Sequence, residues 1–467
     1  MPATIIDSIL FGDLFSSPAM RAVFSDEQRI QYYLDIEGAL ARVQARLGII
    51  PQAAAEEIGR HCRVEQIDMA RLKKQIDTIG HPVLPVVQQL VGLCSGGLGE
   101  WCHWGTTTQD IIDTATIMQV RDALKLVEQD LAVISAALAT LAERYRDTPM
   151  AGRTKTQQAV PISFGLKMAE LLATFERHRT RLRELRARVL VGQFAGAAGT
   201  LASLGTDGLR VQEALMAELG LQQPEIAWHT VRDRFAEIGC FLGLVTGTLG
   251  KIAMDVNLMA QTEVQEASES FAPGRGSSST MPQKRNPVST SYILACTAVI
   301  RQHVAALLDA MVAEHERSNG PWEIEWIVLP EIFLLASGAL AHARLLVSGL
   351  QVDPARMTKN LELTGGMIVA EAVMMGLGPH LGRQRAHDLV QEICRAAIAA
   401  GRPLLDSLAE NAEVSRHVDR AALAKLTDPA NYLGVSGQMI DSVLTAYRSR
   451  APESAAGAEV APTEARK

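Results

Sequence analysis

The sequence predicts an all-α protein in which long helices pack into a bundle. Apolar residues recur at steps of three and four over long stretches, which is the spacing of one helix face. The aromatic content is only 4%, and the strict alternation that strands show is scarce. Long amphipathic helices can therefore bury stripes of Ala, Leu and Val against one another. The helical pattern covers residues 113–146, 162–190, 231–268, 288–316 and 329–350.

The composition limits the class of protein. The chain has 467 residues, of which 48% are hydrophobic, and this is ample for a large core. A net charge of −7 argues against binding to nucleic acid or to a membrane surface. The six cysteines lack metal-finger spacing, which favours reduced thiols and no metal site. No signal peptide is evident, and the apolar run 239–250 is shorter than a bilayer requires, so we expect a cytoplasmic protein.

Polar residues gather in the breaks between the predicted helices. Loops often bring hydroxyls, amides and cations together, so we expect the functional residues there. The tail 451–467 is rich in Ala, Glu and Pro and is predicted to be disordered. The breaks are residues 80–85, 101–110, 148–161, 192–205, 271–287 and 316–326.

The segment GSSSTMPQKRNP, residues 276–287, holds the densest group of hydroxyls. A serine acts as a base only when a nearby cation or backbone N–H groups favour its alkoxide. Lys284 and Asn286 are suited to hold a carboxylate and the charge that develops on it. The same composition also fits a Ser/Thr-rich surface loop before a helix, so the residues alone leave both interpretations open.

Two histidines precede or lie within such loops. His103 is followed by Thr106, Thr107 and Thr108, whose hydroxyls would cap the next helix or bind a carboxylate at its positive end. His103 and His81 can each be structural or catalytic, and the residues alone do not decide between these roles.

Two further loops carry cations. Lys155 lies among threonines and glutamines, which suits a solvated charge, an anion ligand or a proton carrier. Arg317 precedes Trp322 and Trp326, which are four residues apart and would share one helix face. The two indoles can form part of the core or the wall of a substrate pocket.

At this point the motifs resemble those of a known family. GSSSTMPQKRNP resembles the signature of the fumarase/aspartase superfamily, and HWGTTTQDIIDT and GRTKTQQAVPISFGLK resemble its first two conserved regions, in the same order. The resemblance extends to about residue 449. SPAMRAVFSD, WHTVRDR and ERSNGPWEIEW are similar to the 3-carboxy-cis,cis-muconate cycloisomerases of bacteria.

The resemblance implies a fold of three helical domains. They comprise an N-terminal domain at 1–112, a central five-helix bundle with the signature loop at 113–363, and a small C-terminal domain at 364–450. Four subunits would pair their bundles into a twenty-helix core. Each active site of this homotetramer would take loops from three subunits.

The resemblance also implies a reaction that needs no metal and no organic cofactor. Members remove a proton next to a carboxylate and expel a group from the neighbouring carbon of a small di- or tricarboxylate. Ser278 would be the base, and Lys284 and Asn286 would hold the resulting aci-carboxylate. We also expect substrate contacts from His81, Thr106, Thr107, Thr108, Gln109, Gln157, Arg234, Ser279, Met281, Arg317, Trp322 and Trp326.

Departures from the family pattern refine these roles. Lys155 stands where a catalytic histidine is common, and Ser291 where its orienting glutamate is expected. We therefore expect Lys155 to donate a hydrogen bond to a substrate carboxylate or to the leaving group. His103 is preferred to His81 as the proton donor because it adjoins the three threonines. Adenylosuccinate lyases bind a phosphate near the positions of the two tryptophans, and indoles cannot neutralise a phosphate.

Three functions remain in competition, and we expect the first of them. The first is 3-carboxy-cis,cis-muconate cycloisomerase, which closes a lactone in aromatic-acid breakdown. The second is a C–N lyase that releases fumarate from an N-substituted aspartate, such as an iminodisuccinate- or nitrosuccinate-type compound. The third is an inactive structural homologue, which the intact Ser278, Lys284 and Asn286 disfavour.

Overall fold

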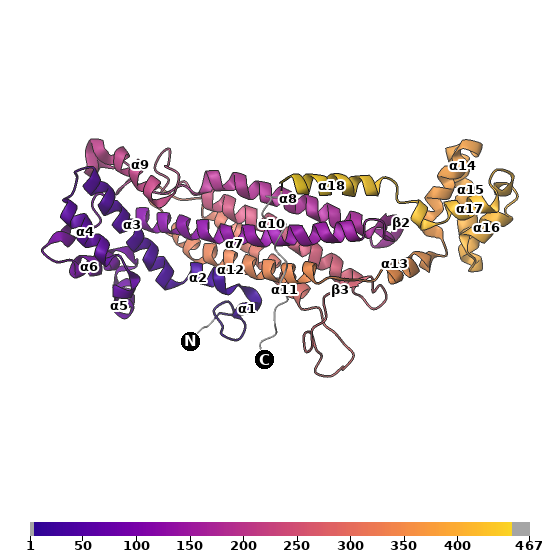
Figure 1. The fold of residues 1–467 in the computed structure, drawn as a ribbon, viewed down its shortest axis with the longest axis horizontal. Helices are drawn as coiled ribbons and strands as arrows, with labels where there is room; N and C mark the ends of the chain where they lie inside the picture. The colour runs from indigo at the N-terminus through magenta and orange to yellow at the C-terminus, as the bar shows by residue number, and fades with distance from the viewer. Residues whose placement is uncertain (1–3, 451–467) are drawn as a thin grey trace. The chain divides into compact units, whose positions relative to one another are not determined.

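Long helices dominate the computed structural model, which describes residues 4–450 (Figure 1). The predicted all-α class is confirmed, and each predicted helical stretch contains one long helix. The predicted disordered tail lies outside the described residues. The long helices are α7 (Thr108–Arg144), α8 (Phe164–Val189), α10 (Asp233–Met259), α11 (Ser289–Asp309) and α12 (Pro321–Ser348).

The ends of four helices differ from the predicted ones. Helix α7 begins at Thr108 rather than at 113. Helix α10 ends at Met259 rather than at 268, and the chain takes a left-handed conformation at Gln265, with φ of 52°. Helix α11 ends at Asp309 rather than at 316, and His315 is left-handed in the same way. Helix α12 begins earlier than predicted, at Pro321, because proline suits the first turn of a helix.

A β-hairpin replaces the loop that was predicted at residues 148–161. Strand β1 (Pro149–Thr154) pairs antiparallel with β2 (Gln157–Ser163) around a two-residue turn. The turn residues Lys155 and Thr156 both have positive φ, 48° and 65°, which fits the tight turns of hairpins. A second small pair joins β3 (Ala267–Ser268) to β4 (Gln351–Val352).

The first of two compact units comprises Met1–Ala132, His178–Ala253 and Val288–Arg344. Its core includes a stripe of fully buried residues on α7, spaced by three and four as the sequence predicted: Ile117, Val120, Leu124, Val127 and Leu131. The shorter helices of this unit are α1 (Gly12–Phe15), α2 (Pro18–Val23), α3 (Asp26–Arg46), α4 (Gln52–His61), α5 (Met69–Ile79), α6 (Val83–Leu93) and α9 (Gly208–Leu219).

The second unit comprises Val133–Arg177, Met254–Pro287 and Leu345–Lys467. It holds the hairpin, the signature loop and the C-terminal helices, whose apolar side chains form a core of their own. That core includes Val373, Leu377, Leu389, Leu404 and Leu423. The helices are α13 (Pro354–Leu361), α14 (Ala370–Leu381), α15 (Arg383–Ala400), α16 (Leu404–Glu410), α17 (Arg420–Leu426) and α18 (Ser436–Arg450).

Three helices, α10, α11 and α12, are long and apolar enough to cross a membrane by length and composition alone. The apolar run 239–250 therefore lies within a helix of 27 residues, and the shortness of the run does not decide whether this helix could span a membrane. Helices α10 and α12 bury 56% and 67% of their most apolar stretch, whereas α11 buries only 28%. Val299 and Leu308 are among the large apolar side chains that α11 exposes.

Candidate functional site

In the first unit, one buried carboxylate organises the threonine loop. Asp110 lies in the first turn of α7 and is 1% exposed. It joins the start of α7 to two other loops, because each of its oxygens has several partners. These are Thr106 Oγ1 (3.2 Å), Thr107 N (3.1 Å), Ala195 N (3.0 Å), Gly196 N (2.9 Å) and His229 Nε2 (2.8 Å).

Arg317 places a positive charge beside this loop. Its Nη1 donates to Thr107 Oγ1 at 3.2 Å, and its Nη2 donates to the carbonyl of Ala197 at 3.0 Å. Its Nε is buried and has no hydrogen-bond partner. Among the residues that the structure describes, no carboxylate pairs with this guanidinium. The charge is therefore available to an anion, and Thr107 is suited to bind the same anion.

His103 is held by a carboxylate that sequence reasoning missed. Glu37 of α3 is 2% exposed, and its Oε1 lies 2.6 Å from His103 Nδ1. Its Oε2 accepts the backbone N–H of His103 at 3.1 Å. Burial alone would lower the pKa of His103, but the Glu37 carboxylate outweighs it and raises that pKa. The sequence did contain a signal for this residue, because Glu37 is a carboxylate within the largely apolar stretch IEGALARV.

His81 has the opposite environment. Burial is the main cause that lowers its pKa, and the nearby His103 lowers it further. Its Nδ1 is buried and has no hydrogen-bond partner. The environments of the two histidines therefore shift their pKa values in opposite directions, that of His103 upward and that of His81 downward.

Two predicted substrate residues have side chains that already serve the fold. Gln109 is fully buried, and its Nε2 donates to the carbonyl of His229 at 2.8 Å. Arg234 donates to the carbonyl of Arg188 at 3.2 Å and lies 3.6 Å from a carboxylate oxygen of Glu225. Their bonds place them in the scaffold around the threonine loop, and their contact with substrate stays a prediction.

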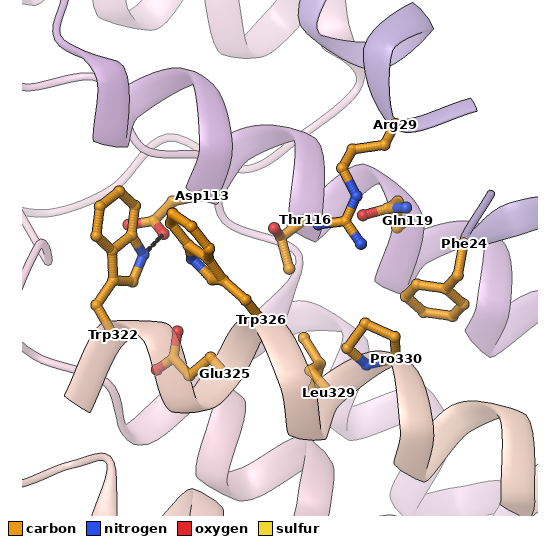
Figure 2. Close-up of a pocket in the computed structure, with 10 residues that line it drawn as sticks. All are labelled: Phe24, Arg29, Asp113, Thr116, Gln119, Trp322, Glu325, Trp326, Leu329 and Pro330. Carbon is orange, nitrogen blue, oxygen red and sulfur yellow. Dashed lines mark hydrogen bonds between the residues drawn. The ribbon is translucent and has the colours of Figure 1, made fainter. Parts of the chain in front are cut away.

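The two tryptophans lie in contact on one face of α12, with ring centroids 5.0 Å apart (Figure 2). Trp322 is buried, and its Nε1 donates to Asp113 Oδ1 at 3.0 Å. They line a cavity of about 10 Å³, which also touches Arg29 of α3 and Phe24. A cavity of that volume has room for about one water molecule and is far smaller than ligand pockets.

A buried ion network fixes the tryptophans. Arg232 is 3% exposed, and its guanidinium bonds Asp113 at 2.7 Å and Glu325 Oε1 at 2.9 Å. Burial raises the pKa of Glu325, which shares a single guanidinium with Asp113. Removing Arg232 would leave two buried carboxylates without a countercharge, so this network is a structural element of the first unit.

In the second unit, the signature loop forms a closed turn, which we call the flap, residues 271–287. Ser278 Oγ accepts the N–H groups of Met281 at 3.0 Å and Thr280 at 3.3 Å. The base of the flap is joined by Asn286 N, which donates to the carbonyl of Gly276 at 2.8 Å. Backbone donors on Ser278 Oγ would favour its alkoxide, which suits the role of base.

The remaining flap residues are open to solvent. Ser279, Met281 and Lys284 are exposed, and the Lys284 ammonium has no ion-pair partner within residues 4–450. Asn286 is exposed as well, although its Nδ2 donates to the carbonyl of Gly276 at 3.1 Å. Gly276 has a φ of 70°, and a Cβ there would lie 2.3 Å from the carbonyl oxygen of Asn286. This closure therefore requires glycine.

Lys155 and Gln157 are exposed at the tip of the hairpin. The hairpin beneath them is anchored by Arg153, which bonds both oxygens of the fully buried Glu266 at 2.8 and 2.7 Å. Asn360 Nδ2 of α13 donates to the same carboxylate at 2.8 Å. The anchored strands of the hairpin thus hold the exposed ammonium of Lys155 at its tip.

The structure brings the predicted residues together in groups. In the first unit, His81 lies near His103, and Thr106 and Thr107 lie with Arg317. In the second unit, the flap residues share one turn, and Lys155 and Gln157 share the hairpin tip. Within the described part of the chain, no group of three or more His, Cys, Asp or Glu residues is arranged to hold a metal ion.

Comparison with known proteins identifies relatives over nearly the whole chain. The family described as Lyase matches residues 15–301, and the one described as Adenylosuccinate lyase C-terminus matches residues 366–443. Trans-aconitate decarboxylase 1 of Mycosarcoma maydis is 58% identical over 434 residues, 93% of this chain and 88% of that protein. The 3-carboxy-cis,cis-muconate cycloisomerase of Pseudomonas aeruginosa is 46% identical over 443 residues, 94% of this chain and 96% of that protein.

A solved structure agrees with these relatives. The crystal structure of the 3-carboxy-cis,cis-muconate lactonizing enzyme from Pseudomonas putida has a TM-score of 0.89 and 42% identity. The match covers 95% of this chain and 99% of that one. The resemblance seen in the motifs is therefore confirmed, and the chain belongs to the fumarase/aspartase superfamily of lyases.

Proposed function

We propose that this lyase acts on an unsaturated aliphatic tricarboxylate and passes through a carbanion next to a carboxylate. Two relatives are named for such compounds, because trans-aconitate and 3-carboxy-cis,cis-muconate each carry three carboxylates and a conjugated double bond. In both reactions, negative charge gathers on a carbon beside a carboxylate. A site that holds this aci-carboxylate can therefore serve either substrate.

Decarboxylation of trans-aconitate is the leading reaction, and the observation that carries it is the 58% identity with a decarboxylase of that compound. The bond to the departing CO2 breaks, and its electron pair forms a new double bond. The pair of the old double bond moves to the carbon that bears another carboxylate, and a proton is added there. The products are CO2 and a dicarboxylate with a terminal methylene group.

The residues of the site have distinct roles in this reaction. Thr107 and Arg317 bind one carboxylate, because the guanidinium has no carboxylate partner among the described residues. Lys284 and Asn286 hold the carboxylate that takes up the negative charge. Lys155 binds the third carboxylate from the hairpin tip. His103 adds the proton to the carbanion, because the Glu37 carboxylate beside its Nδ1 raises the pKa of the imidazole.

Cycloisomerisation of 3-carboxy-cis,cis-muconate is the second candidate, and the full-length structural match supports it. There a carboxylate of the substrate adds to its own double bond, and the same aci-carboxylate is protonated. Ser278 would then act in the reverse direction, as the base that removes this proton. Release of fumarate from an N-substituted aspartate uses the same charged intermediate and is the third candidate.

We also propose that the protein is a soluble homotetramer in which each active site takes loops from several subunits. The exposed apolar residues of α11 support this proposal, because a stripe of that kind is covered in a helical core of several chains. Light scattering on the purified protein tests it. A mass of one chain at micromolar concentration would contradict the tetramer.

The test of function is a product analysis with three substrates. The folded protein is mixed in turn with trans-aconitate, 3-carboxy-cis,cis-muconate and N-substituted aspartates, and each mixture is followed by proton NMR. Terminal methylene signals from trans-aconitate, with CO2 release, establish the decarboxylase. A lactone from the muconate establishes the cycloisomerase. Fumarate from an aspartate with neither tricarboxylate turned over would overturn the tricarboxylate proposal.

A further inference from the structure

The carboxylate of Glu37 is committed almost entirely to His103. One oxygen lies 2.6 Å from His103 Nδ1, and the other accepts the backbone N–H of the same residue at 3.1 Å. Glu37 is 2% exposed, so water does not compete for these bonds. His103 itself has a φ of 59°, a conformation that is uncommon for residues other than glycine and often marks a functional site.

The other titratable groups around Glu37 and His103 do not compete for the charge interaction between them. The thiols of Cys62 and Cys102 both interact with Glu37, but burial raises their pKa values, that of Cys62 to about 12. Cys94 hydrogen-bonds Cys102, and burial raises its pKa too. These thiols therefore stay neutral at physiological pH. Asp110 is the other carboxylate that acts on His103, and it favours the charged imidazole as well.

His81 is the imidazole that could compete for the proton. It interacts with His103, but within residues 4–450 it has no carboxylate partner, and its buried Nδ1 makes no hydrogen bond there. Two neighbouring imidazoles do not both gain charge readily, because like charges repel. When environments push two titrating groups apart, the pair divides into one acid and one neutral partner.

We propose that Glu37 is a positioning residue that decides which of the two histidines carries the proton. Glu37 fixes Nδ1 of His103 as a donor and leaves Nε2 to deliver a proton. His81 stays neutral and serves as a hydrogen-bond partner of the substrate. The assignment of the acid rests on the proposed function, whereas the distribution of charge between the histidines does not.

The charge distribution is tested without substrate. Deuterium exchange of the imidazole Cε1 proton, measured by mass spectrometry over a range of pH, gives the pKa of each histidine in the full chain. In the native protein, His103 should titrate above His81. In Glu37→Gln the His103 value should fall and the His81 value should rise, because the amide accepts a hydrogen bond but carries no charge. Unchanged values in this variant would overturn the proposal.

Glu57 provides a matched control. It is also a buried carboxylate of the first unit, and its Oε1 accepts Ser95 N at 2.9 Å and Ser95 Oγ at 2.7 Å. Glu57→Gln removes a buried charge but no bond to His103. It should leave the titration of both histidines in place. If it moved them as much as Glu37→Gln does, the effect would be a general loosening of the fold.

The consequence for turnover is tested separately. Glu37→Gln should lower kcat by about 100-fold, the size of a general-acid contribution, with little change in KM. Its pH profile should lose activity at a lower pH than that of the native enzyme. Glu37→Asp should restore part of the activity, and His103→Asn should add little to Glu37→Gln. Shifted titrations with unchanged kcat would overturn the acid role alone and leave the charge assignment standing.

Discussion

The threonine loop of the first unit and the flap of the second carry the two sets of carboxylate-binding residues, and they are built in opposite ways. The threonine loop is tied by Asp110, a 1% exposed carboxylate with partners in three segments. The flap is almost wholly exposed, and Ser278 Oγ is bonded only to N–H groups of its own turn. The first segment is held by bonds to other parts of the fold, whereas the printed bonds of Ser278 Oγ stay within its own turn.

This contrast separates two demands on an active site. A substrate carboxylate that serves to orient the substrate is best bound by a rigid segment of the protein. Positioning lowers the activation barrier only when the geometry is fixed. The residues that hold the charged intermediate must shield it from water and then release the product, and an exposed loop can move to do both. Substitutions in the two segments should therefore act on different quantities.

Ser278→Ala is expected to have the largest effect, and only on catalysis. In the cycloisomerisation, where Ser278 transfers the proton, its loss should lower turnover of 3-carboxy-cis,cis-muconate by about 1,000-fold. The melting temperature should not change, since Ser278 bonds only within the flap. Turnover and thermal unfolding of the variant are measured together. A large drop in melting temperature would show that the flap is part of the folded core, and the comparison between the two segments would fail.

Asp110→Asn should do the reverse and act mainly on stability. The substitution leaves two buried backbone N–H groups and His229 facing an amide in place of a charge. Breaking a buried pair on one side costs about 3 kcal/mol of the free energy of unfolding. Urea unfolding gives this value. Glu27→Gln, on the exposed surface of α3, serves as the control, and a loss below about 1 kcal/mol for Asp110→Asn would contradict the fixed-loop description.

Arg317→Lys tests whether the fixed loop binds substrate. Lysine keeps the charge but cannot bond Thr107, the Ala197 carbonyl and a carboxylate in one plane. We expect KM to rise about 10-fold with kcat reduced less, because the lost contact is present both before and during reaction. Steady-state kinetics with the substrate that the product analysis identifies give both constants. A loss confined to kcat would show that Arg317 acts in the chemical step and not in substrate binding.

The motif of the flap is easier to recognise in the sequence than the contacts of the fixed loop, for a physical reason. Flap function depends on residues within one short segment, so its motif is visible in the sequence. Around the threonine loop, His103 bonds Glu37 and Asp110 bonds His229, and these partners are distant in the chain and meet only after folding. Helix periodicity located the long helices, but it missed the hairpin at Lys155, because a six-residue strand of mixed composition has little alternation.

The pH dependence of stability offers a further test of the first unit. Glu37 raises the pKa of His103 above its ordinary value of about 6.5, so the folded state favours the charged imidazole. The stabilisation is complete below that ordinary value and is lost as pH rises through the pKa of the folded state. The difference in unfolding free energy between native protein and His103→Asn should shrink over that range. A difference that is constant from pH 5 to pH 8 would contradict this prediction. The flap variant Ser278→Ala should show no such dependence of stability on pH.

The smallest effect is expected at the hairpin tip. The tip is exposed, as the flap is, but the strands below it are anchored by a buried carboxylate, as the threonine loop is. Thr156 has a φ of 65°, an unfavourable conformation for a β-branched residue, and its hydroxyl bond to the Lys155 carbonyl offsets only part of the strain. Thr156→Gly should raise the free energy of unfolding by about 0.5 kcal/mol, because the relief of strain exceeds the added freedom of the unfolded chain. Thr154→Gly, in the adjoining strand, should lower it by a similar amount. If both glycines destabilise equally, the turn is not strained, and its left-handed residues have no bearing on how Lys155 is presented.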